Sequence, residues 1–535
     1  MNKILHIKYE VIYMSTRKCG ILLHPISLPS HYGIGDLGAE SYAFVDFLAE
    51  AGQKLWQVLP FGHTGYGDSP YQSFSTFAGN PLMISPDILV KDELLSESDI
   101  AEIPFFEPCK IEYGKVIDYK YSLYRKAFAN FDGKDKAYRA FCRKNAFWLD
   151  DYALFMALKN YFIEQRKNTI NSAEYKEYKK AVGRKMSENS VKDCFYGACW
   201  NSFPAELRDR EPSALAKYKK LLKTEVDFYK FIQFEFFKQW ADLKKYANES
   251  GIEIIGDIPI FVAADSADTW SFREVFKINE KGFPIEVAGV PPDYFSEDGQ
   301  LWGNPLYDWD KLAQDNYDWW VRRVSAVSDL FDIVRIDHFR AFESYWAIPF
   351  GAKTARKGKW KKGPQTALFE AIKEKLGDIE IIAEDLGDLN PEVLELRDKL
   401  GFPGMKILQF AFGSFDNPYF PHNYENSNCV VYTGTHDNDT TLGWYLSCDE
   451  KTRDMVRRVL NVSGDNIVWD MIRMAVSSSA KYCIIPVQDV LGYGTDTRMN
   501  TPGVSGGNWQ FMFERGRLTK ETAANLKYLC TLFNR

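Results

Sequence analysis

Three carboxylate residues, Asp337, Glu384 and Asp437, each close an apolar run of the sequence. Arg335 lies two positions before Asp337 in FDIVRIDHF (331–339). Side chains two apart on a strand point to the same side, so these two should project together. An arginine beside an aspartate lowers the pKa of the carboxyl and keeps it ionised, as a nucleophile requires.

If these runs are neighbouring strands, the three carboxylates meet at one rim. Like charges crowded into a partly desolvated cleft raise at least one pKa, so one carboxyl can stay protonated and act as a general acid. An attacking carboxylate and a second one that gives and takes a proton perform retaining glycoside cleavage.

A plainer interpretation also fits these residues. An aspartate at a strand end is often the N-cap of the next helix, which applies to Asp337, Asp385 and Asp437. His338 and His436, which adjoin two of the acids, are of a type that often serves a structural hydrogen bond. Because no His-x-x-x-His or cysteine cluster is present, the sequence predicts neither a metal nor a cofactor.

Aromatic and polar residues alternate in two segments that should fall on the same rim, 66–81 (YGDSPYQSFSTFAGNP) and 299–309 (GQLWGNPLYDW). Flat rings can cover the C–H faces of a sugar while amides and carboxylates bind its hydroxyl groups. Loops packed by their own aromatic residues would show a similar composition. The combination favours a long neutral polysaccharide as ligand.

The elements that must position these residues are short runs of Ile, Val and Leu, typical of strands buried on both faces of a parallel sheet. Amphipathic helical stretches such as 40–52 and 366–377 separate most of them. This alternation predicts an α/β fold, a closed (β/α)₈ TIM barrel, with a doubly wound open sheet as the alternative. The eight runs are residues 19–29, 54–61, 252–262, 331–339, 379–387, 405–412, 429–437 and 483–492.

Two spacings interrupt this rhythm. A large, mainly helical insertion after the second strand should form a subdomain at about 90–250, and a Pro/Gly-rich active-site loop should occupy about 263–330. No long all-β tail, and so no C-terminal β-sandwich, follows the eighth run. We expect residues 17–535 to form the catalytic barrel and residues 1–16 to be a leader of unclear role, with Met14 as a second possible start.

The chain has 535 residues, is 45% hydrophobic and carries a formal net charge of −7. The length allows one elaborated domain or two to three ordinary ones, and the charge gives no footprint for nucleic acid. We interpret the basic run at 353–363 as a solvated loop. No membrane span or signal peptide is evident, and nine scattered cysteines suggest reduced, structural thiols and a cytoplasmic protein.

Six motifs, in order, resemble the amylomaltases, also called disproportionating enzymes or 4-α-glucanotransferases, in the α-amylase clan. They are GYGDSPYQS, LWGNPLYDW, VRIDHFR, IIAEDLG, TGTHDNDT and GGNW, and the resemblance extends from about Gly20 to the C-terminus. It implies a (β/α)₈ barrel with insertions and without the β-sandwich of amylases.

The resemblance also implies a role for each matching residue. Asp337 would be the nucleophile, Glu384 the acid/base and Asp437 the carboxylate that holds sugar hydroxyls and favours the distorted transition state. The substrate-binding residues implied are Arg335, His338, His436, Asp257, Trp302, Gln300, Tyr71, Ser69 and Asn508, with Tyr66 in a second glucan-binding patch.

The family reaction passes part of an α-1,4-glucan to another glucan or to glucose instead of water. We expect residues 284–305 to form the cover that excludes water. The alternatives are a hydrolase or branching enzyme of the same clan, or a non-catalytic glycan-binding protein. Oligomeric state is not predicted.

Overall fold

The computed structural model describes residues 17–535 except 66, 168, 170, 171, 293–295, 388 and 505. The expected leader, the question of Met14 and the assignment of Tyr66 therefore lie outside the described residues.

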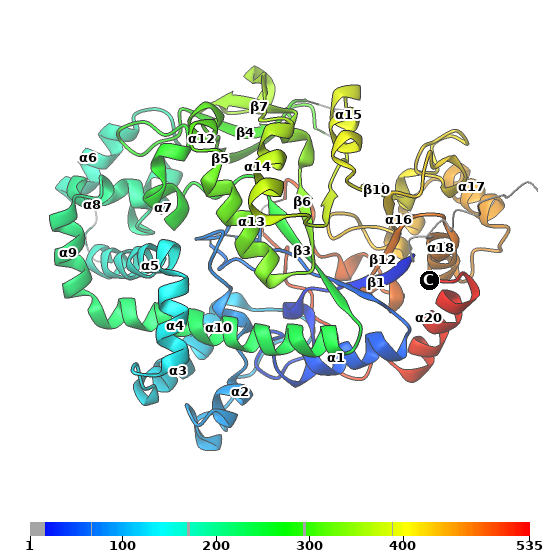
Figure 1. Ribbon diagram of the computed structural model, residues 1–535, viewed down its shortest axis with the longest axis horizontal. Helices are drawn as coiled ribbons and strands as arrows, with labels where there is room; N and C mark the ends of the chain where they lie inside the picture. Colours follow the sequence, from blue (N-terminus) through cyan, green and yellow to red (C-terminus); the bar gives the residue numbers. More distant parts are fainter. Residues whose placement is uncertain are drawn as a thin grey trace, which may run out of the picture.

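Eight parallel strands form a ring in which neighbours in space are neighbours in sequence. The ring closes between β9 and β10, where the Ala383 N–H donates to the Pro403 carbonyl at 3.0 Å. Figure 1 shows two of these strands, β3 and β6, near the middle of the molecule. The strands are β1 (Lys18–Leu22), β2 (Leu55–Gln57), β3 (Glu253–Pro259), β6 (Ile333–Asp337), β9 (Ile381–Ala383), β10 (Gly404–Ile407), β11 (Cys429–Tyr432) and β12 (Tyr482–Pro486).

Each of the eight apolar runs overlaps one barrel strand, so the predicted (β/α)₈ barrel is confirmed and the open doubly wound sheet is wrong. Helices in contact with one another surround it, α1 touching α10 and α20, and α13 touching α10 and α14. The helices of this layer and the C-terminal region are α1 (Ala39–Glu50), α13 (Asp318–Leu330), α14 (Thr366–Leu376), α15 (Pro391–Leu400), α16 (Thr441–Ser447), α17 (Glu450–Leu460), α18 (Ile467–Ser477), α19 (Val487–Val490) and α20 (Lys520–Leu532).

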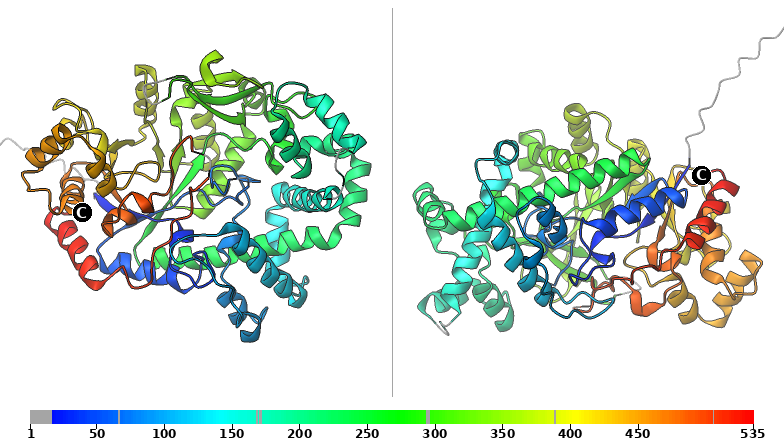
Figure 2. Two further views of the ribbon diagram at one scale, coloured as in Figure 1. Left: turned by 180° about the vertical axis from the view of Figure 1, so that it is seen from behind. Right: turned by 90° about the horizontal axis from the view of Figure 1, so that it is seen from below.

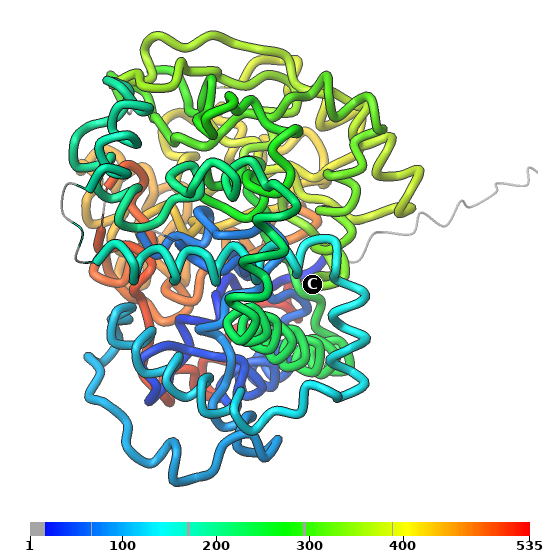
Figure 3. The backbone as a smooth tube through the Cα atoms, turned by 90° about the vertical axis from the view of Figure 1, so that its left-hand side faces the viewer, coloured from blue at the N-terminus to red at the C-terminus, as the bar shows by residue number. Residues whose placement is uncertain are grey.

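The chain between β2 and β3 is mainly helical, as expected. Its buried residues, such as Leu123, Phe155 and Phe228, belong to the same hydrophobic core as the barrel strands. The insertion lies to one side of the barrel, as Figure 2 shows from behind and below, and faces the viewer in Figure 3. Its helices are α2 (Pro86–Lys91), α3 (Tyr113–Asn130), α4 (Lys136–Lys144), α5 (Ala146–Arg166), α6 (Ala173–Val182), α7 (Glu188–Tyr196), α8 (Ala205–Arg208), α9 (Pro212–Leu221) and α10 (Lys223–Glu249).

The helix α10 packs on α1, α13 and β3, so it also serves as the barrel helix that precedes β3. A separate small cluster joins α6 and α7 to Phe283. The boundary of an inserted subdomain at about 90–250 stays a prediction, because the insertion shares the barrel's core.

The segment 263–330 is more ordered than the loop that composition indicated. It contains α11 (Ala267–Ser271), β4 (Glu286–Val290), β5 (Gln300–Pro305) and α12 (Trp309–Gln314), besides α13. The strands β4 and β5 form an antiparallel sheet with β7 (Ser344–Pro349) and β8 (Lys359–Lys362), in the order β5-β4-β7-β8. The basic run 353–363, interpreted above as a solvated loop, ends in the edge strand β8, because pairing with β7 satisfies its backbone.

Among the described residues, no strand follows β12, which agrees with the missing C-terminal β-sandwich. In the same part of the chain no helix is both long and apolar enough to cross a membrane.

Candidate active site

The register of β6 and β9 brings two of the three acids together. Ile336 pairs with Ala383, so Asp337 and Glu384 follow as the next residues of adjacent strands. Two backbone bonds of 3.0 Å, from Glu384 N–H to the Ile336 carbonyl and from Phe339 N–H to the Glu384 carbonyl, hold this arrangement. Adjacent strands lie about 4.8 Å apart, which suits two carboxyl groups that act on one bond.

Arg335 lies at the centre of a charge network beneath these acids. Its guanidinium donates to Asp257 at 2.5 Å and to Asp337 at 3.1 Å. Asp257 pairs with Arg335 in the register of β3 and β6 and also accepts from the Tyr71 hydroxyl at 2.7 Å. The Arg335 and Asp257 side chains are 4% and 0% exposed, so each charge is buried with its partner.

The pKa of Asp337 differs from the sequence expectation. Burial raises the pKa of its carboxyl, Arg335 lowers it, and the nearby Glu384 and Asp257 carboxylates raise it again, which leaves it well above the usual range. Burial and like charges therefore act against the effect expected of Arg335, and the ionised state of Asp337 stays a prediction.

Glu384 has the properties of a group that can hold a proton at neutral pH. Burial raises its pKa to about 7, although Arg335 and two backbone N–H groups oppose this change. These N–H groups belong to Leu386 and His338 and contact the two carboxylate oxygens at 2.9 and 2.7 Å. The carboxyl group is thereby fixed in orientation.

His338 adopts a left-handed backbone conformation with φ of 55°, which turns the chain sharply after Asp337 and aims its N–H at Glu384. Its ring meets the Trp302 ring edge-on at a centroid distance of 4.8 Å. The Trp302 indole donates to Gln300 at 3.0 Å, so these residues of β5 stand beside the acids. Burial lowers the pKa of His338 to about 3, and the ring is neutral.

Asp437 is held by a different part of the chain. Its Oδ1 accepts from the Asn500 amide at 2.6 Å, and its backbone carbonyl accepts from Arg498 at 2.6 Å. The Asn500 N–H donates to the His436 carbonyl at 3.1 Å. Asn500 and Arg498 were missed by the sequence reasoning; the only available signal was the polar, Gly-rich composition of 494–508, after the eighth strand.

An aromatic wall connects the two parts of the site. The Tyr71 ring stacks on His436 at 5.3 Å with an interplanar angle of 15°, and Trp509 lies 5.8 Å from Tyr71 and 6.0 Å from His436. Burial lowers the pKa of His436, so a neutral ring stands between the charged groups. Tyr71 thus links Asp257, on the strand side, to the segment that carries Asp437.

Two of the expected substrate-binding residues bond to their own loops. The Asn508 side chain accepts from Thr501 N–H at 3.0 Å and donates to the Val504 carbonyl at 2.9 Å. The Ser69 hydroxyl accepts from Tyr71 N–H at 3.3 Å. Their sugar-binding roles stay predictions.

The N-cap interpretation fails for all three aspartates. The residue that caps the turn after β6 is His338, and Thr440 caps α16. Asp385 has a structural task, since it accepts from the Met405 N–H at 2.7 Å and binds Arg397. A side chain at Gly404 would collide with it, because a Cβ there would lie 2.3 Å from an Asp385 oxygen.

Within the described residues, no group of three or more His, Cys, Asp and Glu is arranged to hold a metal ion. A closed barrel that carries an aspartate and a glutamate side by side at its strand ends, with a buried arginine bonded to the aspartate, defines an enzyme that works through paired carboxylates.

Comparison with known proteins gives the particular family. A family profile described as 4-alpha-glucanotransferase, glycoside hydrolase family 77, matches residues 23–518, and the chain belongs to this family. It is 46% identical over 519 residues to the 4-alpha-glucanotransferase of Clostridium butyricum, with 96% of this chain and 100% of the relative covered. The enzyme of that name from Thermus thermophilus is 45% identical over 524 residues, covering 96% of this chain and 97% of the relative.

Solved structures agree. The amylomaltase from Streptococcus agalactiae, in complex with acarbose, superposes with a TM-score of 0.87 at 37% identity, covering 97% of this chain and 99% of that one. The amylomaltase from Corynebacterium glutamicum has a TM-score of 0.72 at 16% identity, with 97% and 75% covered, and supports the fold alone. The resemblance drawn from the six motifs is confirmed.

Proposed function

We propose that this chain is a 4-α-glucanotransferase that cuts an α-1,4-glucan and passes the cut segment to the 4-hydroxyl of glucose or another glucan. The observation that carries this proposal is the adjacency of Asp337 and Glu384 across β6 and β9, with Arg335 bonded to Asp337. Family membership supplies the substrate class, and the related Streptococcus agalactiae structure holds acarbose.

In the first step an Asp337 oxygen attacks the anomeric carbon of the donor sugar. Glu384 gives its proton to the glycosidic oxygen, and the bond between that oxygen and the anomeric carbon breaks. In the second step Glu384 takes the proton of the acceptor's 4-hydroxyl. The oxygen of that hydroxyl group then displaces Asp337 from the anomeric carbon. This step restores both carboxyl groups and retains the anomeric configuration.

We assign the single proton of this pair to Glu384. Asp337 accepts a direct bond from the Arg335 guanidinium, and its side chain is 29% exposed, so its charge has a cation and water nearby. Glu384 accepts from neutral backbone N–H groups and has a pKa raised to about 7. A proton on Glu384 and a charge on Asp337 is the state that the first step needs.

The remaining polar groups orient the sugar. Neutral His338 and His436 can bond hydroxyl groups without adding charge, and Trp302 can cover a ring face. We assign Asp437 to hydroxyl groups of the sugar whose bond is cut, because Asn500 orients the Asp437 carboxylate and the side chain of Asp437 is 43% exposed.

Maltotriose tests the proposal. Transfer to a 4-hydroxyl yields a ladder of longer maltooligosaccharides together with glucose. Maltose and glucose alone would favour the hydrolase alternative, and α-1,6 branches in the products from amylose would favour the branching enzyme. If Asp337→Asn and the wild type processed glucan equally, a non-catalytic glycan-binding role would replace this proposal.

Preference for a sugar acceptor over water requires a cover on the site. We assign this cover to 284–305, of which residues 293–295 lie outside the described part. The hairpin β4–β5 bears Gln300 and Trp302 beside His338, and Arg356 pairs with Glu297 and Asp298 near its end. Shortening the hairpin should raise hydrolysis relative to transfer in maltotriose, and an unchanged ratio would refute this role.

A cytoplasmic location also stays our proposal. It rests on the nine cysteines, which are all free thiols in the described residues. Fractionation of the source cells, with the activity followed by the maltotriose assay, tests it; activity outside the cytosolic fraction would contradict it.

A further inference from the structure

Two cysteines of the insertion, Cys194 and Cys199, lie in contact outside the active site. Cys194 lies in the last turn of α7, and Cys199 precedes the short 3₁₀ helix Trp200–Ser202. The Cys199 N–H donates to the Cys194 carbonyl at 2.8 Å, and the two thiols are hydrogen-bonded to each other. Both residues keep partial exposure.

The other thiol cluster of the molecule provides a contrast. Cys19 contacts Cys483 and Cys530 through its thiol, but all three are at most 3% exposed in the barrel core. The thiols of this cluster are close together but are buried away from solvent. Of these two clusters, the pair Cys194 and Cys199 is the one that combines adjacent thiols with partial exposure.

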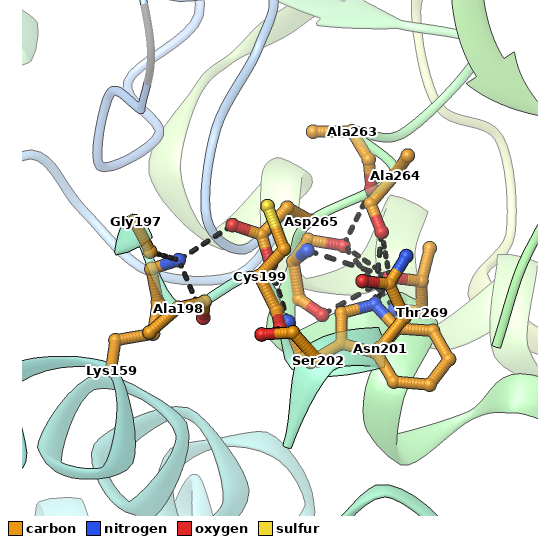
Figure 4. Close-up of polar contacts among 12 residues, drawn as sticks. Lys159, Gly197, Ala198, Cys199, Asn201, Ser202, Ala263, Ala264, Asp265 and Thr269 are labelled. Atoms are coloured by element: carbon orange, nitrogen blue, oxygen red, sulfur yellow. Dashed lines mark hydrogen bonds and ion pairs between the residues drawn. The ribbon is translucent and has the colours of Figure 1, made fainter. Parts of the chain in front are cut away.

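The segment that carries the pair rests on two buried cations from α5. The Lys159 ammonium donates to the Gly197 carbonyl at 3.0 Å and the Ala198 carbonyl at 3.2 Å, and it pairs with Asp265 at 2.6 Å. Arg166, two turns further on α5, donates to the Phe195 carbonyl at 2.6 Å. Figure 4 shows Lys159, Cys199 and Asp265 in this cluster.

These contacts shift the pKa values of the two thiols in opposite directions. The hydrogen bond from Cys199 lowers the pKa of Cys194, and Lys159 acts in the same direction against burial and Asp265. The same bond, together with burial, raises the pKa of Cys199. Thiolate character makes a cysteine a nucleophile, so Cys194 is the attacking sulfur and Cys199 the resolving one.

We propose that Cys194 and Cys199 form a redox-active dithiol site that small disulfides of the glutathione class convert to an intramolecular disulfide. The Cys194 thiolate attacks one sulfur of oxidised glutathione, whose S–S bond breaks and releases one glutathione thiolate. Cys199 then loses its proton to water and attacks the Cys194 sulfur, which releases the second glutathione. The protein loses two electrons, and oxidised glutathione is reduced to two thiols.

The site lies at a joint of the fold. Trp200 donates its backbone N–H to Asp265 at 3.0 Å and its indole N–H to the Ala264 carbonyl at 2.9 Å, in the segment after β3. In that segment Ala267 N–H donates to the Phe74 carbonyl at 2.7 Å, three residues from Tyr71. The disulfide would therefore restrain the contact between the insertion and the loops beside the site.

Peptide mass spectrometry after incubation of the full chain with oxidised glutathione tests the proposal. We expect the peptide that spans both cysteines to lose two hydrogens and to become inert to alkylation at both positions together. The matched control is Cys448→Ser, which removes another half-exposed thiol at the end of α16 and should leave this closure unchanged. In Cys199→Ser, Cys194 should instead retain a glutathione adduct, because the resolving thiol is missing.

A second measurement does not depend on oxidation. Trivalent phenylarsine oxide bridges two adjacent thiols, so the wild type and Cys448→Ser should bind one equivalent more than Cys194→Ser or Cys199→Ser. Equal stoichiometry in all four proteins would overturn the proposal, as would two separately alkylated thiols after glutathione treatment. Both readouts are independent of the proposed glucan transfer, which the maltotriose assay judges by itself.

Discussion

The two halves of the active site are built in opposite ways. Asp337 and Glu384 stand on adjacent barrel strands, and their positions follow from strand register and a buried arginine. Asp437 follows β11 at the start of a loop, and it is oriented by the Asn500 side chain, 63 residues further along. The strand-borne half contains Arg335 at 4% exposure, whereas the Asp437 side chain is 43% exposed.

This difference separates two ways of placing a charge. On the strand side, ladder hydrogen bonds define the backbone and the low dielectric makes each charge depend on its partner. On the loop side, water shares the charge and single side-chain contacts define the geometry. We therefore expect large and coupled losses on the strand side and smaller, local losses on the loop side.

The largest effect should come from Asp337→Asn or Glu384→Gln. Each removes a group that makes or breaks a bond, so kcat for maltotriose disproportionation should fall by about 10⁴-fold or more. The matched control is Asp385→Asn, beside Glu384 but engaged with Met405 and Arg397. Asp385→Asn should lower the melting temperature but leave most of the rate per folded enzyme. A similar 10⁴-fold loss of kcat in this variant would remove the distinction between Glu384 and Asp385.

Arg335→Met should combine a kinetic and a structural loss. Asp257 has no exposed side-chain surface, and stranding its charge should cost about 3–5 kcal/mol in the free energy of unfolding. We also expect kcat to fall by about 10²-fold or more, because Asp337 loses its cation. Arg335→Lys retains a charge, and its stability and rate should lie between those of the wild type and Arg335→Met. Denaturant unfolding measures the stability, and initial rates on maltotriose measure the kinetic loss. A methionine variant as stable as the wild type would show that the network is not coupled.

The pH profile should reveal the proton on Glu384. Its pKa of about 7 means that the acid form is lost as pH rises, so kcat/KM should decline above pH 7 by about tenfold per pH unit. Arg335 lowers this pKa, and its removal should therefore move the alkaline limb to higher pH. His338, with a pKa of about 3, stays neutral throughout and should not contribute. If the alkaline limb of the kcat/KM profile is unchanged in Arg335→Met, the proton that controls it belongs to a group other than Glu384.

Asn500→Ala should have the smallest effect of the four, because it removes one hydrogen bond to a partly exposed carboxylate. We expect kcat/KM to fall by about tenfold, near the low end of the about 1.5–3 kcal/mol for a bond to a charged group, because the carboxylate is partly exposed. Asn500→Asp should be worse, since like charges would face each other. Steady-state kinetics with a thermal melt checks this, and an equal loss in both variants would mean that charge at Asp437 does not matter.

The sequence predicted the fold well because its signals are local. Each barrel strand is an apolar run, and an acid at the end of such a run must lie at the carboxyl edge of the sheet. The same reasoning placed Arg335 beside Asp337. It missed the strands of the segment 263–330, because β4 pairs with β7, a strand from beyond residue 343, and composition cannot report a distant partner.

The site was predicted in part for the same reason. His338, Trp302, Gln300, Tyr71 and Asp257 came together as expected, since motif and strand position both pointed to the rim. Asn500 and Arg498 were missed because their partner is Asp437, which no spacing connects to them. The raised pKa of Asp337 was missed because it depends on burial and on three other carboxylates.

The sequence by itself determined which residues carry charge at the strand ends and in which order the strands close, because periodicity and side-chain direction are properties of short segments. Only the tertiary structure decided how those charges titrate and which distant loop holds Asp437. Both depend on the number of charges and the amount of water that the folded chain places around one group, and neither quantity is written in any single stretch of sequence.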